Sequence, residues 1–126
     1  MITVRRVPGT WAIARLDPAE GWPWWATRSR FASVTRTPAE TSVVCEEALV
    51  PAAVKAEPGF ALYTVDGPIP FDAVGILSTL VQPLAAAGIS IFSVSSYDTD
   101  YLLVATAMVD RVEAAWRAAG LGVVAD

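Results

Sequence analysis

The sequence predicts an α+β fold, because strand-forming segments alternate with two amphipathic helical segments along the chain. Hydrophobic residues make up 54% of the 126 residues and charged residues only 17%, which is enough apolar surface to build a core. No Gly/Ser-rich linker divides the chain, so we expect its two halves to pack as one body. Helices on one face of antiparallel sheets are the arrangement that this pattern favours.

The first half is rich in strand-forming residues and less regular than the second. Residues 2–7 and 10–16 are β-branched and apolar, and Pro8-Gly9 between them is a turn signal. These two segments are therefore predicted to form a hairpin.

Three tryptophans follow within residues 21–25, where we expect a short irregular or helical piece. Packing of these rings against the sheet is favoured because aromatic rings bury large areas, with an exposed binding patch as the alternative. Strands are predicted at 31–36 and 41–45, followed by a short helical turn within 46–53.

The second half begins with a predicted strand at 59–65 and continues with a helix whose N-cap is Asp72. Apolar residues at spacings of three, four and seven form one face of this helix: Val74, Leu77, Leu80, Val81 and Leu84. Gly88 ends the helix, and Pro83 is expected to kink its last turns.

The remaining elements are a strand at 89–96, a tight turn at 97–100, a strand at 101–105, a helix at 107–119 and a strand at 121–125. Residues 59–125 therefore follow the order βαββαβ, a ferredoxin-like pattern.

Composition excludes several classes of function. The net charge of -4 argues against a nucleic-acid binder, although residues 1–36 are basic and the remainder is acidic. Histidine is absent, which removes Ser–His and Cys–His catalysis. The single cysteine, Cys45, allows no internal disulfide, suits a reducing compartment and is expected to be buried and inert. The uncharged run 73–97 fits a buried helix and strand better than a membrane span, and no signal peptide is evident.

Three features are candidates for a binding site. Gly75, near the start of the first long helix, follows Asp66-Gly67-Pro68, and free N–H groups at a helix N-terminus suit a carboxylate. Simple helix–sheet packing is the alternative explanation for this glycine.

The turn Tyr97-Asp98-Thr99-Asp100 offers two carboxylates for a cation or an amino group, or as an acid/base pair. Ordinary turn chemistry is the alternative, because aspartate favours turns. The third feature is a run of strand serines that suggests a wet cavity or an interface: Ser90, Ser93, Ser95 and Ser96.

Three long segments carry a resemblance to a known family: SVTRTPAETSVVCEEALVP (33–51), FDAVGILSTLVQPLAAAGIS (71–90) and GISIFSVSSYDTDYLLV (88–104). They resemble the ACT-domain proteins related to the CASTOR-type arginine sensors and their bacterial, aspartokinase-like relatives. The resemblance runs nearly from end to end.

The resemblance implies two ACT-type units, a degenerate one at 1–58 and a second at 59–126. It implies an amino-acid sensor that holds its ligand between modules of a homodimer. The residues themselves predict that the chain is not an enzyme, because no nucleophile–base pair is evident, and that it needs no cofactor or metal. The single cysteine fits a cytoplasmic location. The resemblance also implies these ligand-binding residues: Gly75, Ile76, Leu77, Ser90, Ile91, Tyr97, Asp98, Thr99 and Asp100. Asp100 matches an acidic residue that meets a guanidinium, whereas Ala73 stands where the sensors have a glutamate. A ligand-free protein–protein interaction module is the competing hypothesis.

Overall fold

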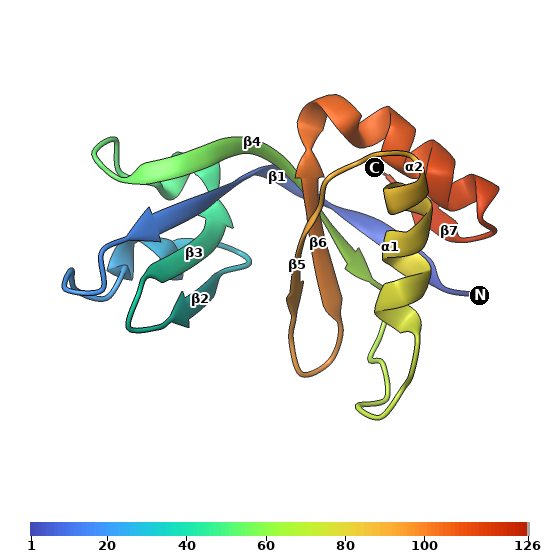
Figure 1. Ribbon diagram of the computed structural model, residues 1–126, viewed down its shortest axis with the longest axis horizontal. Helices are drawn as coiled ribbons and strands as arrows, with labels where there is room; N and C mark the ends of the chain where they lie inside the picture. Colours follow the sequence, from blue (N-terminus) through green and yellow to red (C-terminus); the bar gives the residue numbers. More distant parts are fainter. Residues whose placement is uncertain (126) are drawn as a thin grey trace. The chain divides into compact units, whose positions relative to one another are not determined.

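The computed structural model describes residues 1–125 of the chain, which contain seven strands, two α-helices and three short 3-10 helices (Figure 1). In chain order these elements are β1 (Thr3–Leu16), η1 (Trp24–Arg28), β2 (Ser33–Arg36), β3 (Thr41–Glu46), η2 (Glu47–Leu49), β4 (Lys55–Val65), α1 (Ile76–Ala86), β5 (Phe92–Ser95), β6 (Asp100–Ala105), η3 (Thr106–Met108), α2 (Val109–Ala118) and β7 (Gly122–Val124). No helix formed by residues 1–125 combines the length and hydropathy needed to cross a membrane.

The chain divides into two compact units. The first contains Met1–Pro8 and the chain from Ala61 onward, and the second is Gly9–Phe60. The predicted boundary lay between residues 58 and 59, so the second unit ends close to it. The first eight residues, however, belong with the C-terminal part of the chain.

In the first unit the hydrogen-bonded strand order is β7-β1-β4-β6-β5. From β4 onward the elements follow the predicted order βαββαβ, which confirms an α+β fold with two helices. Strands β5 and β6 form an antiparallel hairpin, as expected. β7 instead runs parallel to β1, with Thr3 opposite Gly122, so this sheet is mixed and not purely antiparallel.

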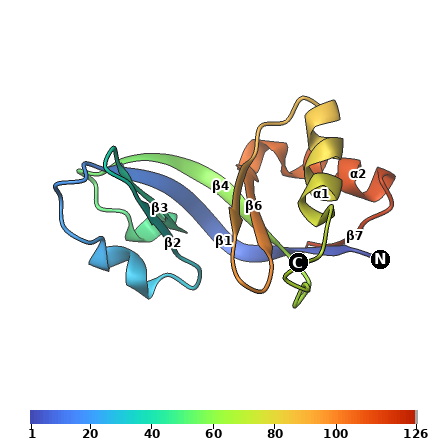
Figure 2. The same ribbon diagram turned by 60° about the horizontal axis from the view of Figure 1, so that its bottom comes forward.

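Helices α1 and α2 lie side by side in both views and share one hydrophobic core with the strands (Figures 1 and 2). The fully buried indole of Trp116 in α2 is its largest member. Its Nε1 donates a hydrogen bond of 2.9 Å to the Leu80 carbonyl of α1, and its ring meets Tyr63 of β4 edge-on at 4.9 Å between centroids. One side chain thus joins both helices to the sheet.

The core also contains one buried carboxylate. Glu113 in α2 is only 6% exposed and accepts hydrogen bonds from the Arg6 guanidinium and the Tyr63 hydroxyl. The hydrogen bond with Glu113 raises the pKa of Arg6. Burial, followed by the neighbouring Glu113, raises the pKa of Tyr63. Arg6 therefore stays charged and the Tyr63 hydroxyl keeps its proton at neutral pH, so both can donate to the buried carboxylate.

Both α-helices end as the sequence predicts. In α1 the N–H of Ile89 bonds the Leu84 carbonyl at 2.9 Å and that of Gly88 bonds Ala85. In α2 the N–H of Leu121 bonds the Trp116 carbonyl at 3.0 Å. These are the paired bonds of a Schellman motif, which satisfy carbonyls that a helix end leaves open.

The second unit is a small sheet around its own core. β3 pairs antiparallel with both β2 and the later part of β1, from Trp11 opposite Glu46 to Leu16 opposite Thr41. Its core consists of Ala14, Leu16, Ala26, Val43 and Cys45. Residues 9–60, all of which are described, form no α-helix, so the βαββαβ order of the first unit is not repeated here.

The predicted hairpin over residues 2–16 was wrong, because these residues form the single strand β1. Each part of β1 pairs with a different strand, β7 with the first part and β3 with the second, and not with its own continuation. Pro8 tolerates extended backbone, and Gly9 absorbs the local irregularity with a φ of +114°.

The sequence favoured packing of all three tryptophans of residues 21–25 against the sheet, and this was wrong for two of them. Only Trp25 packs against the core of the second unit. Trp22 is 42% and Trp24 73% exposed, and their rings meet edge-on at 6.3 Å. The 3-10 helix η1, which begins at Trp24, buries Ala26 and leaves the Trp24 ring exposed.

Cys45 is buried, and burial together with the neighbouring Glu46 raises the pKa of its thiol to about 11. Because the thiolate is the reactive form, we expect Cys45 to react with a disulfide reagent at pH 8 at least about a hundred times more slowly in the folded protein than in denaturant. Thiol-exchange absorbance measures both rates. Equal rates in the two states would contradict this burial.

Candidate functional site

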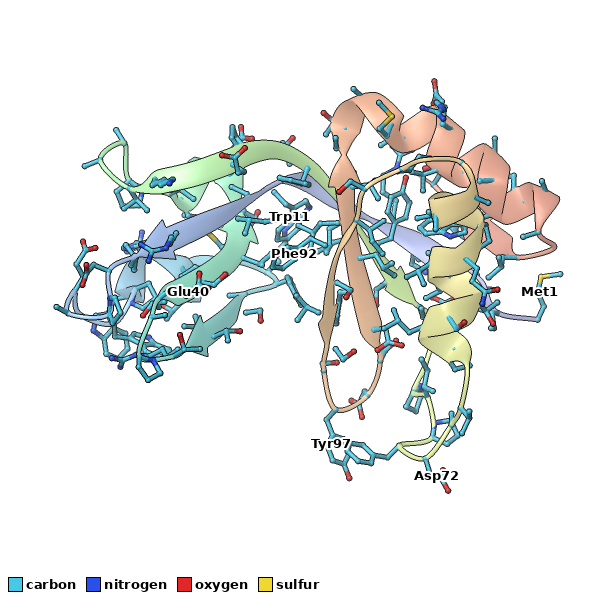
Figure 3. The ribbon with its side chains drawn as sticks, in the orientation of Figure 1. Met1, Trp11, Glu40, Asp72, Phe92 and Tyr97 are labelled. Atoms are coloured by element: carbon cyan, nitrogen blue, oxygen red, sulfur yellow. The ribbon has the colours of Figure 1, made fainter. Side chains whose placement is uncertain are left out.

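A cavity of about 390 Å³ lies in the first unit, between the segment that leads into α1 and the β5–β6 turn. Figure 3 shows Tyr97 at the tip of this turn, extending toward the loop that carries Asp72. The residues that line the cavity come from these two segments: Ile69, Pro70, Phe71, Ala73, Gly75, Ile76, Leu77, Ser78, Ser95, Ser96, Tyr97, Asp98, Thr99 and Asp100.

The first wall is the N-terminus of α1. The helix begins at Ile76 with Gly75 as N-cap, and no side chain among the described residues caps it. The first N–H groups of a helix have no partner within the helix, and they carry the positive end of its dipole. Ile76, Leu77 and Ser78 of this turn line the cavity.

The prediction of Asp72 as N-cap was wrong. The chain turns at residues 70–73, where the Ala73 N–H bonds the Pro70 carbonyl at 2.9 Å, so the helix starts three residues later than a cap at Asp72 implies. Val74 accordingly lies outside the helix and is 94% exposed, although its spacing placed it on the apolar face.

Gly75 adopts a left-handed conformation, with a φ of +84°, and a Cβ added there would touch nothing within 4 Å. We therefore expect Gly75→Ala to lower the free energy of unfolding by about 1–2 kcal/mol through backbone strain alone. Urea denaturation measures the change. Gly21→Ala is the matched control, because Gly21 has equal space without a left-handed φ, and a similar loss in both variants would contradict the explanation.

The second wall is the β5–β6 turn, which Ser96 and Thr99 close. The Ser96 N–H donates to the Thr99 carbonyl at 2.8 Å, and the Ser96 hydroxyl bonds both the carbonyl and the N–H of Thr99. The Thr99 hydroxyl donates to the Val65 carbonyl at 2.7 Å, which fixes the turn to the end of β4. Tyr97 and Asp98 are left at the tip.

Direct contacts hold the two walls together. The Ile69 N–H donates to the Asp98 carbonyl at 2.7 Å. Phe71 and Tyr97 are each 80% exposed, and their rings meet at 5.1 Å between centroids, so they form an aromatic rim to the cavity.

An ion pair between Arg5 and Asp66 fixes the start of the loop that leads to this rim. The Arg5 guanidinium contacts both carboxylate oxygens of Asp66, and this hydrogen bonding holds the pKa of Asp66 below its usual range. The loop therefore leaves β4 from an anchored residue.

The two walls carry opposite electrostatic character. One presents backbone N–H groups at a helix N-terminus, and the other presents the carboxylates of Asp98 and Asp100. Among the described lining residues none is Arg, Lys or Cys. This arrangement can bind a small molecule that carries an anionic and a cationic group.

The structure brings seven of the nine predicted site residues to this cavity: Gly75, Ile76, Leu77, Tyr97, Asp98, Thr99 and Asp100. Ser90 and Ile91 do not line it. β5 starts at Phe92, three residues later than the predicted strand, and Ile91 packs partly against the core. A ligand role for these nine residues stays a prediction.

Ile69, Pro70, Phe71 and Ser78 line the cavity but were not among the predicted site residues. Their sequence signal is weak, since the prolines at 68 and 70 are typical of an extended loop and do not mark a binding site. The serine run did point to a cavity, and two of its members, Ser95 and Ser96, line it.

Comparison with known proteins identifies the family. The model of the ACT domain matches residues 55–117, and a second model, described as an N-terminal domain, matches residues 9–53. No curated protein matches the sequence.

Among solved structures, a protein of Agrobacterium tumefaciens is 35% identical, with a TM-score of 0.93 over 99% of this chain and 93% of that one. The regulatory subunit of aspartate kinase from Thermus thermophilus is 10% identical, with a TM-score of 0.64 over 92% of this chain and 96% of that one. Aspartokinase III of Escherichia coli is 13% identical, with a TM-score of 0.65 over 94% of this chain but only 32% of its own. The last two likenesses show a shared fold. From the match over residues 55–117, which is half of its length, the chain belongs to the ACT domain family.

Proposed function

We propose that this chain is a regulatory protein that senses a small molecule, an amino acid, and is not an enzyme. The observation that carries the proposal is the cavity between α1 and the β5–β6 turn. Its uncapped helix N-terminus suits an α-carboxylate, and Asp98 and Asp100 suit an ammonium or guanidinium group. Membership of the ACT family, whose domains are regulatory, supports this role.

We further propose that a homodimer completes the site. The CASTOR-type sensors that the sequence resembles hold their ligand between ACT modules of two homologous halves, and one such half resembles this whole chain. The rim of the cavity is formed by the exposed rings of Phe71 and Tyr97, and Val74, just before α1, is also exposed. A second copy placed there gives these side chains a partner. Ser90 is exposed outside the cavity, so a role in binding requires such a second copy.

The identity of the amino acid is a separate part of the proposal. The E. coli aspartokinase III structure holds aspartate and ADP, which concerns that protein alone. In this chain Ala73 lines the cavity without offering a carboxylate, so arginine is not singled out. We expect the ligand to be an amino acid whose cationic group faces Asp98 and Asp100. A cytoplasmic location fits the single buried cysteine.

A protein–protein interaction module is the second candidate, because Trp22 and Trp24 expose a pair of indole rings in the second unit. Exposed aromatic pairs of this kind are typical of protein interfaces. On this alternative no amino acid binds, and the Trp22–Trp24 pair contacts a protein partner.

Melting temperatures with each of the twenty amino acids at millimolar concentration, beside a measurement of size in solution, separate the two candidates. A ligand at a hundred times its Kd adds about 2.7 kcal/mol, a shift of several degrees for a chain of this size. A shift with one amino acid and a dimeric size support the sensor. A monomer that binds tightly contradicts the dimeric site, and no shift with any amino acid favours the interaction module.

A further inference from the structure

Ser95 holds the side chain of Asp100 from across the hairpin. The two residues are opposite each other in the β5–β6 register, and both line the cavity. The Ser95 hydroxyl donates to Oδ1 of Asp100 at 2.6 Å. A hydrogen bond to a carboxylate is in general shorter and stronger than one between neutral groups.

The bond leaves the carboxylate able to bind something else. It engages Oδ1, whereas no donor among the described residues contacts Oδ2. The main chain of Asp100 is held independently, because its carbonyl accepts a hydrogen bond from the Thr64 hydroxyl at 3.4 Å. Ser95 therefore fixes where the free carboxylate oxygen of Asp100 lies, and not where the strand lies.

The side chain of Ser95 has no part in closing the turn. The bonds between Ser96 and Thr99, and the bond from Thr99 to Val65, close it without Ser95. Ser95 is also exposed, so its hydroxyl adds little to stability. A hydrogen bond that contributes little to folding but orients a charged group beside a cavity has its main effect on binding.

We propose that Ser95 is a positioning residue that orients Asp100 to receive the cationic group of the ligand. The inference rests on the proposed function, because it concerns the same cavity. It adds a residue that touches Asp100 and not the ligand. A carboxylate held in one orientation loses less conformational freedom when it pairs with an ammonium group.

The test is a double-mutant cycle measured by isothermal titration calorimetry on the full chain. L-lysine and L-norleucine are the probes, since norleucine keeps the α-ammonium group but lacks the ε-ammonium group. We expect Ser95→Ala to weaken binding of at least one probe about fivefold. In an Asp100→Asn background the same substitution should have no further effect, because the carboxylate that Ser95 orients is gone.

Two variants complete the design. Ser95→Thr keeps the hydroxyl on a residue that strands favour, and should restore the wild-type Kd. Ser93→Ala is the matched control, because Ser93 is exposed on the same face of β5 but does not line the cavity, and it should leave the Kd unchanged.

Two results overturn the inference while the proposed function stands: an unchanged Kd in Ser95→Ala, or an equal loss in the Asp100→Asn background. If neither probe binds the wild-type protein, cationic-ligand binding at this cavity fails, and the inference fails with it.

Discussion

Replacing Trp116 with alanine is expected to lower the free energy of unfolding by about 3–5 kcal/mol, the largest stability effect that we anticipate for one substitution. The indole is fully buried between α1, α2 and β4. The change leaves a cavity, removes the edge-on contact with Tyr63 and deprives the Leu80 carbonyl of its Nε1–H donor. Urea denaturation followed by circular dichroism measures the loss.

Trp24→Ala is the matched control for this experiment. It removes the same side chain from a position that is 73% exposed, and we expect a change within about 0.5 kcal/mol. Because the two compact units can unfold separately, each variant is compared with the wild type at the transition of the unit that holds it, the first unit for Trp116 and the second for Trp24. A loss below about 1 kcal/mol for Trp116→Ala would contradict the central place of this residue in the core.

Asp100→Asn is expected to weaken binding of L-lysine about thirtyfold, while the free energy of unfolding changes by less than about 0.5 kcal/mol. The substitution keeps the size of the side chain and its place beside Ser95, but removes the charge that faces the cavity. Calorimetry gives the Kd, and urea denaturation gives the stability.

Asp110→Asn controls for the loss of one negative charge from the chain. Asp110 is exposed in the first turn of α2 and does not line the cavity, so its substitution should leave the Kd within about twofold. Equal weakening in both variants would mean that net charge, and not the position of Asp100, governs binding. If Asp100→Asn lowered the free energies of binding and of unfolding equally, Asp100 would stabilise the fold and have no specific role in binding.

The local order of the first unit could be predicted because its signals are short-range. The apolar spacing of Leu77, Leu80 and Leu84 and the glycine after each helix depend on neighbouring residues alone. The start of α1 was misplaced because an aspartate before an apolar run is a good cap only if the chain is helical there. At Asp72 the preceding prolines and the bond from Ala73 to Pro70 turn the chain first.

Pairing between distant strands could not be predicted from local patterns. β1 lies between β7 and β4 in the first unit and pairs with β3 in the second, partners that are far apart in the sequence. The Pro8-Gly9 signal is real, but it marks an irregularity inside a strand and not a turn. The outward placement of Trp24 likewise depends on which residue η1 buries.

The same distinction between local signals and contacts of distant residues applies to the candidate site. Gly75 and the acidic turn were found because helix starts and hairpin turns have sequence signals. Phe71 matters through Tyr97 on the opposite wall, and Ser95 matters through Asp100 across the same hairpin. Neither side-chain contact has a local sequence pattern.

The central claim is that the cavity between α1 and the β5–β6 turn binds an amino acid. Backbone amide NMR spectra of the full chain, recorded as L-lysine or L-norleucine is added, test it most directly. We predict that the shifts concentrate on residues 75–78 and 95–100, which supply the two walls. Shifts confined to residues 22–25, or no shifts at millimolar concentration of either amino acid, would contradict the claim.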